Sequence, residues 1–237
     1  MLAGRDGMIS YAEFDPMRIL DQVALPEGWS FVVAVSGVLA EKTGAAQASY
    51  NRGPALLGQI LERWNRATGR ADASLQGALR SLVGEDLAAG LAEDEERWEP
   101  LRRLADEGAE RDRLDQFLLE SAVLVPRAHR ALRGGDLDAF AATVAASQSL
   151  AETHLRNQVP ETVALVRHAI DLGARAASAF GAGFGGSVWA LVPTADADGF
   201  AAEWMDRYRA SGAAPETAIA LVTRPGAPGR RVGSAAG

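Results

Sequence analysis

The sequence predicts an α+β fold in which strands and amphipathic helices pack in layers. Short apolar runs rich in β-branched residues, at 29–35 and 218–222, are typical of buried strands. Longer segments with apolar residues at helical spacing, such as 55–66, are typical of helices that bury one face. Because the strands do not alternate strictly with helices along the chain, their order favours α+β layers over a doubly wound parallel sheet.

The first third of the chain is predicted to contain two strands and a helical stretch. Residues 8–14 roughly alternate in polarity and are followed by Asp15-Pro16, which should end the strand. Residues 29–35 form the second strand. A helical stretch begins at about Lys42, and Gly53-Pro54 is expected to break or kink it, because proline cannot donate the helical hydrogen bond.

Three further helices are predicted in the second half of the chain. The first, 111–133, contains Pro126, which should kink it. Asp136 then has the position and chemistry of an N-cap for a second helix, which runs to about Leu155. Pro160 opens the third helix, since proline is favoured in a first turn.

Composition and charge narrow the classes of function. The chain has 237 residues, 48% of them hydrophobic, and a formal net charge of −7. An acidic chain without a basic stripe argues against nucleic-acid partners. There is no run of about 18 apolar residues and no apolar leader, so we expect a cytoplasmic protein with no membrane partner. With no cysteine and three scattered histidines, no metal site is expected.

The most distinctive segment is a glycine-dense loop that leads into the predicted strand 187–192. Its glycines are Gly181, Gly183, Gly185 and Gly186. Such a run lets the backbone approach a ligand or another loop closely, and lets N–H groups converge on an anion. The loop lacks the Gly-Lys-Ser/Thr of a Walker loop, and it precedes a strand, unlike the dinucleotide fingerprint. A tight turn between a helix and a strand is the alternative interpretation.

Several segments carry a resemblance to a known family. Residues 181–190 contain a glycine-rich loop of the Gly-x-Gly-Phe-Gly-Gly form, and 131–147 read Ala-Leu-x-Gly-Gly-Asp followed by Phe and Ser. Val159-Pro-Glu161 comes between them in sequence. Upstream lie Val35-Ser-Gly-Val38 and Ser49-Tyr-Asn-Arg52. In this order and spacing, over most of residues 7–222, the segments resemble the C-terminal half of the galactokinases, within the GHMP kinase superfamily.

The resemblance implies a fold, a domain division and an activity. The implied fold is an antiparallel sheet with helices packed mainly on one face. Residues 1–28 would be a remnant of the N-terminal half or a linker strand, 29–223 the C-terminal-type domain, and 224–237 a flexible tail. The implied activity is ATP-dependent phosphorylation of a galactose-like sugar. ATP and Mg²⁺ are then cofactors of the complete kinase, and neither is assigned to this chain alone.

The resemblance also implies site residues. Tyr50 matches the family tyrosine whose hydroxyl reaches the sugar, although a tyrosine on a helix is usually half-buried packing. The loop that would lie near the phosphates contains Gly181, Gly183, Gly185 and Gly186. Phe184, in the same loop, is expected to fill the core rather than to touch a ligand. Glu120 and Ser147 are expected to be packing or helix-surface residues.

Departures from the family pattern concern the catalytic parts. The chain has no counterpart of the N-terminal sugar-gripping loop or of the Gly-Leu-Ser-Ser-Ser phosphate loop. The Met-Asp-Gln stretch, whose aspartate serves as base, would lie just before Met1, so no catalytic residue is assigned. The chain also lacks the second arginine of the Tyr-Asn-x-Arg-Arg stretch, so strict galactose specificity is not implied. Three interpretations stay open: part of a complete kinase, a split-kinase subunit with a partner chain, or a non-catalytic binding or regulatory protein.

Overall fold

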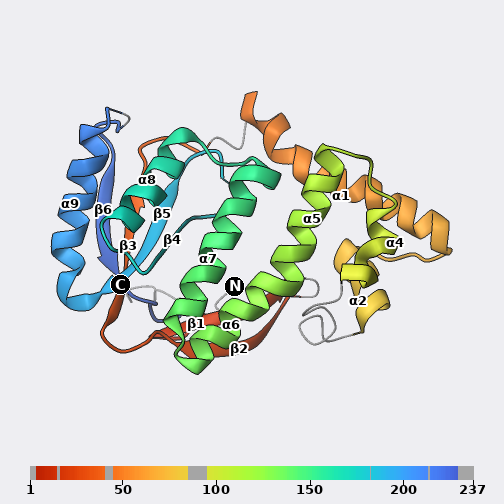
Figure 1. The fold of residues 1–237 in the computed structure, drawn as a ribbon, viewed down its shortest axis with the longest axis horizontal. Helices are drawn as coiled ribbons and strands as arrows, with labels where there is room; N and C mark the ends of the chain where they lie inside the picture. The colour runs from red at the N-terminus through yellow and green to blue at the C-terminus, as the bar shows by residue number, and fades with distance from the viewer. Residues whose placement is uncertain are drawn as a thin grey trace, which may run out of the picture.

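The computed structural model describes residues 4–14, 17–40, 45–84, 95–181, 183–212 and 214–228. The structure has a sheet of four strands. Figure 1 shows this sheet with helices α8 and α9 at one end of the molecule and a group of helices that includes α1, α2 and α4 at the other. Helices α5 and α7 lie between these two ends, and the strands β1 and β2 lie along one side. The described residues therefore form mixed layers of antiparallel sheet and helix, as predicted.

The central sheet joins segments that are far apart in the sequence. Its strands are β3 (Trp29–Val35), β4 (Ala176–Ala179), β5 (Ser187–Pro193) and β6 (Ile219–Thr223), in the order β4-β5-β3-β6. All neighbouring pairs are antiparallel, and Val33 lies opposite Trp189 on one side and Leu221 on the other. This register places alternate residues of each strand on opposite faces of the sheet.

Helices α8 (Pro160–Asp171) and α9 (Ala197–Ala210) cover one face of this sheet. The inward residues of that face are small or β-branched and almost fully buried: Val32, Ala34, Val188, Ala190 and Val192. Two buried polar atoms are satisfied here, because Trp204 Nε1 donates to the carbonyl of Leu165 at 3.0 Å and the Tyr208 hydroxyl donates to the carbonyl of Ser36 at 3.0 Å. Burying each large apolar side chain contributes roughly 1.5–3 kcal/mol, so this layer holds the sheet in place.

The second face of the sheet carries the aromatic side chains. Phe31 and Trp189 meet edge to face at 5.5 Å, beside residues of α6 (Val125–Gly134) and α7 (Leu137–Leu150). Strands β1 (Met8–Phe14) and β2 (Met17–Ala24) form a separate antiparallel pair on this side. Gln148 of α7 accepts a hydrogen bond from the backbone N–H of Ala179 at 3.0 Å, so it covers part of the exposed edge of β4.

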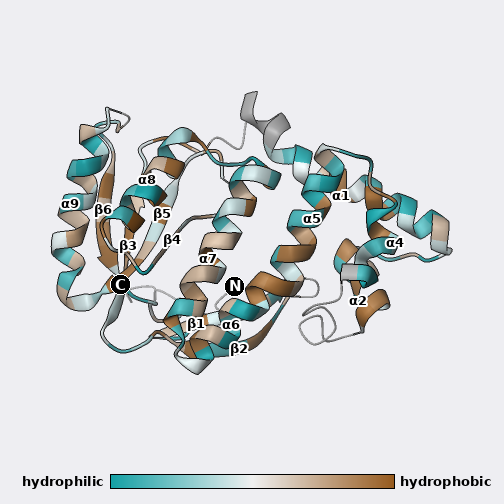
Figure 2. Cartoon of the chain, in the orientation of Figure 1, coloured by the Kyte–Doolittle hydropathy of each residue, from teal (hydrophilic) through white to brown (hydrophobic). Residues whose placement is uncertain are grey.

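A second core lies in the helical end of the molecule. It is formed by α1 (Ala45–Thr68), α2 (Leu75–Val83), a 3₁₀ turn (Glu95–Trp98), α4 (Glu99–Arg102) and α5 (Ala109–Leu119). Its largest fully buried side chains are Ile60, Leu79, Trp98, Leu101, Leu114 and Leu118. Figure 2 shows hydrophobic and hydrophilic residues interspersed along these helices, as expected where one side of a helix is buried.

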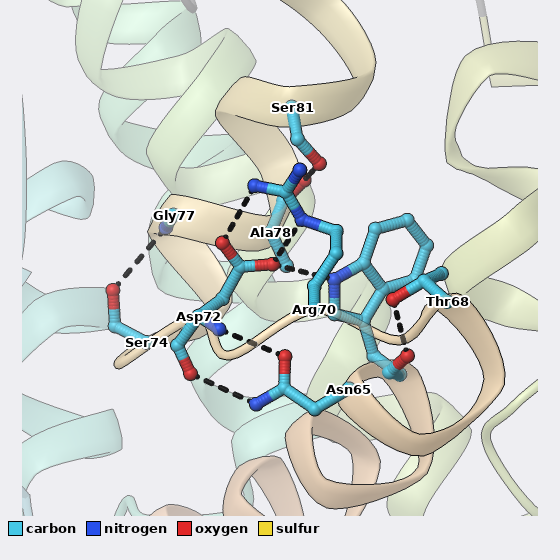
Figure 3. A network of polar contacts seen from close by, with 9 residues as sticks. Asn65, Thr68, Arg70, Asp72, Ser74, Gly77, Ala78 and Ser81 are labelled. Atoms are coloured by element: carbon cyan, nitrogen blue, oxygen red, sulfur yellow. Dashed lines mark hydrogen bonds and ion pairs between the residues drawn. The ribbon is translucent and has the colours of Figure 1, made fainter.

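Asp72 fastens the junction between α1 and α2 (Figure 3). Its carboxylate accepts hydrogen bonds from Trp64 Nε1 at 2.8 Å and from the Arg70 guanidinium at 2.7 and 2.8 Å. The Asn65 side chain bonds both the N–H and the carbonyl of Asp72 at 2.9 Å. Ser74 then caps α2 by accepting from the N–H of Gly77. These contacts set the direction in which the chain leaves α1.

Two π-helical turns interrupt the long helices. The turn Glu120–Leu124 connects α5 to α6, and Ala151–Leu155 extends α7. Pro126 lies in the first turn of α6, directly after the first π turn, where its missing N–H is tolerated. The predicted kink at this proline stays a prediction. Asp136 caps α7 by accepting from the N–H of Ala139 at 2.9 Å, as predicted.

Two strands were not predicted. Residues 17–24 form β2 and residues 176–179 form β4. Helix α1 runs from Ala45 to Thr68 and is not broken at Gly53-Pro54, so the alternative of a kink there stays a prediction; its predicted start at Lys42 falls outside the described residues. Pro54 is exposed and lies in a cavity wall.

In the described part of the chain, no helix has both the length and the apolar character that a membrane span requires.

Candidate functional site

The glycine loop connects β4 to β5, so it links two antiparallel strands rather than a helix and a strand. The predicted helix-to-strand turn is wrong in this respect, because β4 precedes the loop. All four glycines have positive φ, from +62° at Gly181 to +123° at Gly185. Phe184 also adopts a left-handed conformation, with φ +61°. A loop with this backbone requires glycine at most of its positions.

Close contact with another backbone explains the glycine at position 183. The N–H of Phe184 donates to the carbonyl of Asn157 at 2.5 Å. A Cβ on Gly183 would overlap that same carbonyl oxygen. The loop is thereby held against the segment that follows the second π turn.

A second backbone contact explains Gly185. The N–H of Gly186 donates to the carbonyl of Val38 at 2.9 Å, and the N–H of Ser36 donates to the carbonyl of Gly186 at 2.9 Å. A Cβ on Gly185 would lie 2.8 Å from the Val38 carbonyl oxygen, closer than packing allows. Ser36 itself closes a turn by accepting from the N–H of Val38 at 3.1 Å. The loop is therefore clamped between residues 36–38 and Asn157.

A cavity of about 320 Å³ opens beside this loop. Gly181 and Phe184 form one wall, and the N-terminal half of α1, with the half-buried Tyr50, forms another. Gly183, Gly185 and Gly186 support the loop from behind through the contacts above and do not line the cavity. Tyr50 and the glycine loop, 131 residues apart in the sequence, thus border the same space. The role of Tyr50 in sugar binding stays a prediction.

Phe184 differs from its predicted role. It was expected to fill the core, but its side chain is only half-buried and lines the cavity. The left-handed backbone at Phe184 turns the chain so that its N–H reaches Asn157. Sequence reasoning could not find this, because the side chain's direction depends on a φ value that is unusual for a residue other than glycine.

Charged side chains complete the cavity, and sequence reasoning missed them. They come from α1 (Arg52), from the first turns of α5 (Asp112 and Arg113) and from the end of the second π turn (His154 and Arg156). Arg156 Nη2 donates to Asp112 Oδ2 at 2.8 Å, which ties the π turn to α5. His154 Nδ1 lies 2.8 Å from the Thr153 hydroxyl. Arg52 belongs to the Ser49-Tyr-Asn-Arg52 stretch, although it was not predicted as a site residue. No motif marks the other four, since about forty residues separate the two later segments.

Glu120 is a half-buried acid in the helical part of the molecule. It lies in the first π turn, and its Oε1 accepts a hydrogen bond from the Ser147 hydroxyl at 2.9 Å, while Oε2 is buried without a partner among the described residues. Burial raises the pKa of the Glu120 carboxyl, and the Ser147 hydrogen bond opposes this only in part. Both residues pack between helices, as predicted, and neither lines the cavity.

The loop and its surroundings offer limited means of holding a nucleotide or a metal. The N–H groups of Phe184 and Gly186 already donate to carbonyls of this chain. Across the described ranges, three or more acidic or histidine side chains do not gather anywhere in a way that could hold a metal ion. We therefore assign no ligand of Mg²⁺ among these residues.

Comparisons with known proteins address the fold and the family. The family model of the GHMP kinases C terminal matches residues 128–210. The structure of the Lactococcus lactis galactokinase in complex with galactose is similar with a TM-score of 0.71 and 19% identity, covering 94% of this chain and 52% of that chain. The present chain thus spans about half the length of that galactokinase.

Two further solved structures are more distant. The L. major mevalonate kinase in complex with R-mevalonate has a TM-score of 0.42 and 15% identity, over 87% of this chain and 47% of that one. The homoserine kinase of Cytophaga hutchinsonii has a TM-score of 0.40 and 12% identity, over 92% and 48%. No curated protein matches the chain significantly.

The matched segment covers α6 from Ala128 onward, α7, α8, β4, the glycine loop, β5 and α9. It therefore contains the loop and the Arg156-Asn157 wall of the cavity. Residues 128–210 therefore match the family model of the GHMP kinases C terminal, and the chain shares the fold of about half of the Lactococcus lactis galactokinase.

Proposed function

We propose that this chain supplies the C-terminal half of the site of an ATP-dependent sugar kinase of the galactokinase type, active in the cytoplasm. The observation that carries the proposal is the shared cavity, in which Tyr50 and the glycine loop form neighbouring walls. The volume of about 320 Å³ falls within the range of small-molecule sites. The family match of residues 128–210 supports the same reading.

In this proposal each part of the cavity has a separate task. The Tyr50 hydroxyl exchanges a hydrogen bond with a hydroxyl of the sugar, and the rigid loop fixes where the acceptor lies. Phosphoryl transfer depends on the positioning of donor and acceptor and on charge stabilisation around the γ-phosphate, and the protein need not form a covalent bond to the substrate. ATP supplies the phosphoryl group and Mg²⁺ offsets its charge, and both would be held mainly by a second half, in the same polypeptide or in a partner chain.

A binding or regulatory role is the second candidate. It is favoured by the hydrogen bonds that the glycine loop makes within this chain, because the N–H groups of Phe184 and Gly186 are thereby withdrawn from a phosphate. Under this reading the cavity still binds a sugar, but no phosphoryl transfer follows. Sugar binding and phosphoryl transfer therefore have to be measured separately.

Removing the Tyr50 hydroxyl tests the sugar site directly. We expect Tyr50→Phe to weaken binding of D-galactose by about 3- to 10-fold, as for the loss of one hydrogen bond, while the ring keeps its packing. Isothermal titration calorimetry or ligand-observed NMR measures this. Tyr11→Phe is the matched control, since Tyr11 stacks on His129 at 4.5 Å outside the cavity. Equal galactose affinity for Tyr50→Phe and the unchanged chain would show that Tyr50 is not a sugar ligand.

A further inference from the structure

The walls of the cavity carry an excess of positive charge. Among the described residues that line it are three guanidinium groups, from Arg52, Arg113 and Arg156, and one carboxylate, that of Asp112. This concentration is local, since the chain as a whole has a net charge of −7. Binding of a neutral hexose does not require a positively charged surface, so sugar binding alone does not explain the charge of this cavity.

Arg113 is the most informative of the three arginines. Its Nε is buried and has no hydrogen-bond partner among the described residues. Its Nη1 donates to the Gln116 side chain, a neutral acceptor, and among the described residues no carboxylate forms an ion pair with it. Burial lowers the pKa of the Arg113 guanidinium, as expected of a cation without a counter-ion.

Two other part-buried arginines of the same helical region are paired with carboxylates. Arg63 donates to both carboxylate oxygens of Glu110 at 2.6 and 2.8 Å, and Arg102 Nε donates to Asp115 at 2.7 Å. A buried donor left without an acceptor costs stability, and more so when it is charged. Arg113 differs from these two in lacking a carboxylate partner. Arg111, in the same helix, also has a buried Nε without a partner, but it donates to the carbonyl of Arg102 and does not line the cavity, whereas Arg113 does.

The other two arginines are placed to assist. Arg156 has a left-handed backbone, with φ +51°, and its pairing with Asp112 at 2.8 Å holds the guanidinium against the cavity wall. Arg52 is exposed on α1, two residues from Tyr50. Arg113 packs closely against α1, since a Cβ added to Gly53 would lie 3.2 Å from the Arg113 Nε. Packing does not explain why a cation occupies this position.

We propose that the cavity binds a ligand that carries an oxyanion, with Arg113 as its buried donor and with Arg52 and Arg156 at the rim. The proposal deepens the proposed function, because it concerns the class of ligand taken by the same cavity. The oxyanion has two possible sources: the carboxylate of an acidic sugar, or a phosphate group. Guanidinium groups bind both through charge-assisted hydrogen bonds, so the structure specifies their shared chemistry.

The test compares two sugars that differ at one carbon. D-galacturonate carries a carboxylate where D-galactose carries a hydroxymethyl group, and sodium tripolyphosphate serves as the phosphate probe. At low ionic strength we expect the 237-residue chain to bind at least one of the two anions about tenfold or more tightly than galactose. The preference should shrink in high salt because the arginines at the rim are exposed to screening.

Substitutions assign the preference to the arginines. Arg113→Gln should remove most of the preference for the anion over galactose. Arg52→Gln, on the exposed surface of α1, should reduce the anion preference by a smaller factor. It is the second test variant if circular dichroism shows that Arg113→Gln does not fold. Arg167→Gln is the control, since Arg167 is exposed on α8 and does not line the cavity. Titration calorimetry of each variant with all three probes gives the comparison.

Each pattern of affinities for the three probes has one interpretation. An Arg113-dependent preference for galacturonate identifies the oxyanion as that of an acidic sugar, and one for tripolyphosphate alone identifies it as a phosphate. Anion binding with no affinity for either sugar supports the oxyanion site and contradicts the sugar proposal. If neither anion binds better than galactose, or if Arg113→Gln and Arg52→Gln leave the preference unchanged, the oxyanion site is wrong even where galactose binds.

Discussion

At Gly183, the absence of a side chain lets the loop close on Asn157. The backbone there has φ +79°, and the space that a Cβ would need is occupied by the Asn157 carbonyl oxygen. Gly181, in the same loop, has a similar φ of +62° but no atom within 4 Å of the Cβ position. Substituting alanine at each glycine therefore separates two destabilising effects: the left-handed backbone conformation, present at both positions, and the steric overlap, present only at Gly183.

We expect Gly183→Ala to lower the free energy of unfolding by about 3–5 kcal/mol, and Gly181→Ala by only about 1–2 kcal/mol. The smaller value is the cost of a left-handed conformation for an L-residue, and the larger adds the displacement of the Asn157 backbone. Urea unfolding of both variants, followed by circular dichroism, measures the difference. Equal losses would mean that the contact with Asn157 does not constrain the loop.

Glu120 makes stability depend on pH. Because burial raises the pKa of its carboxyl in the folded chain, the folded state holds the proton more tightly than the unfolded state does. The protonated Glu120 carboxyl contributes to the free energy of unfolding. This contribution is fully present below the ordinary pKa of 4.5 and is lost as the pH rises through the raised pKa of the folded state.

Glu120→Gln should therefore be more stable than the unchanged chain at pH 7 and no more stable near pH 4. The amide can still accept the Ser147 hydrogen bond, and it removes the cost of a buried negative charge. Urea midpoints measured from pH 4 to pH 8 give the two curves. Parallel curves over this range would contradict the assignment of the raised pKa to Glu120.

Among single residues, those with a chemical signature could be predicted from the sequence and those brought together by folding could not. The positive φ of the loop glycines and the cap at Asp136 follow from the preferences of these residue types. Arg113 and Arg156 reach the same cavity only because α5 and the second π turn pack together. Neither residue has a local pattern that would reveal this.

At the scale of elements, one ion pair joins α1 to α5. Arg63 and Glu110 approach to 2.6 Å, and the Glu110 side chain is 8% exposed. The hydrogen bonds from Arg63 lower the pKa of Glu110, so their contribution to stability is present above the ordinary value of 4.5 and is lost as the pH falls through the lowered value. This pair fixes α1, and with it Tyr50, relative to the α5 wall of the cavity.

Arg63→Met should cost about 1–3 kcal/mol at pH 7, because it leaves a buried carboxylate without its partner. The estimate is at the low end for such pairs, since the Arg63 side chain is 30% exposed. The penalty should shrink below pH 4.5 as Glu110 takes up a proton. Arg66→Met, on the exposed surface of the same helix, should change the urea midpoint very little. A pH-independent penalty at Arg63 would point to lost packing instead.

The elements that the sequence did not predict have weak local signals. Strand β4 reads Ala-Ala-Ser-Ala, and alanine has a low preference for strands, so its conformation depends on pairing with β5. In β2 the first four residues are all exposed, without the alternation that marks a half-buried strand. Strand β3, which buries alternate residues, and strand β5, which buries Val188 and three successive residues from Ala190 to Val192, were predicted.

At the scale of the whole molecule, the cavity lies where the sheet end and the helical end meet. Its walls come from α1 and α5 on one side and from the glycine loop on the other. A kinase site also needs groups that hold the phosphates, and the 237 residues include neither a Walker lysine motif nor a Gly-Leu-Ser-Ser-Ser loop. Binding and turnover should therefore separate in this chain.

We expect the 237-residue chain alone to show no measurable sugar kinase turnover. Loss of one electrostatic stabiliser typically lowers the rate by about 10²–10³-fold, and here the phosphate loop and the base are both missing. A coupled assay of ADP release with a panel of neutral and acidic sugars measures this. The comparison is the same chain extended by, or mixed with, a segment that carries both motifs. Robust turnover by the short chain would require a different active site.

The order of strands in the central sheet has a consequence for synthesis of the protein in the cell. Strand β3 is complete at residue 35, but its partners β5 and β6 begin at residues 187 and 219. At about 5–20 residues per second, the ribosome needs roughly 8–30 s to reach β5. During that time the apolar side chains of β3 have no sheet to join. We therefore expect the yield of folded protein to depend on chaperones that bind the nascent chain. Slower translation should raise this yield if the slow step comes after β5 has emerged from the ribosome.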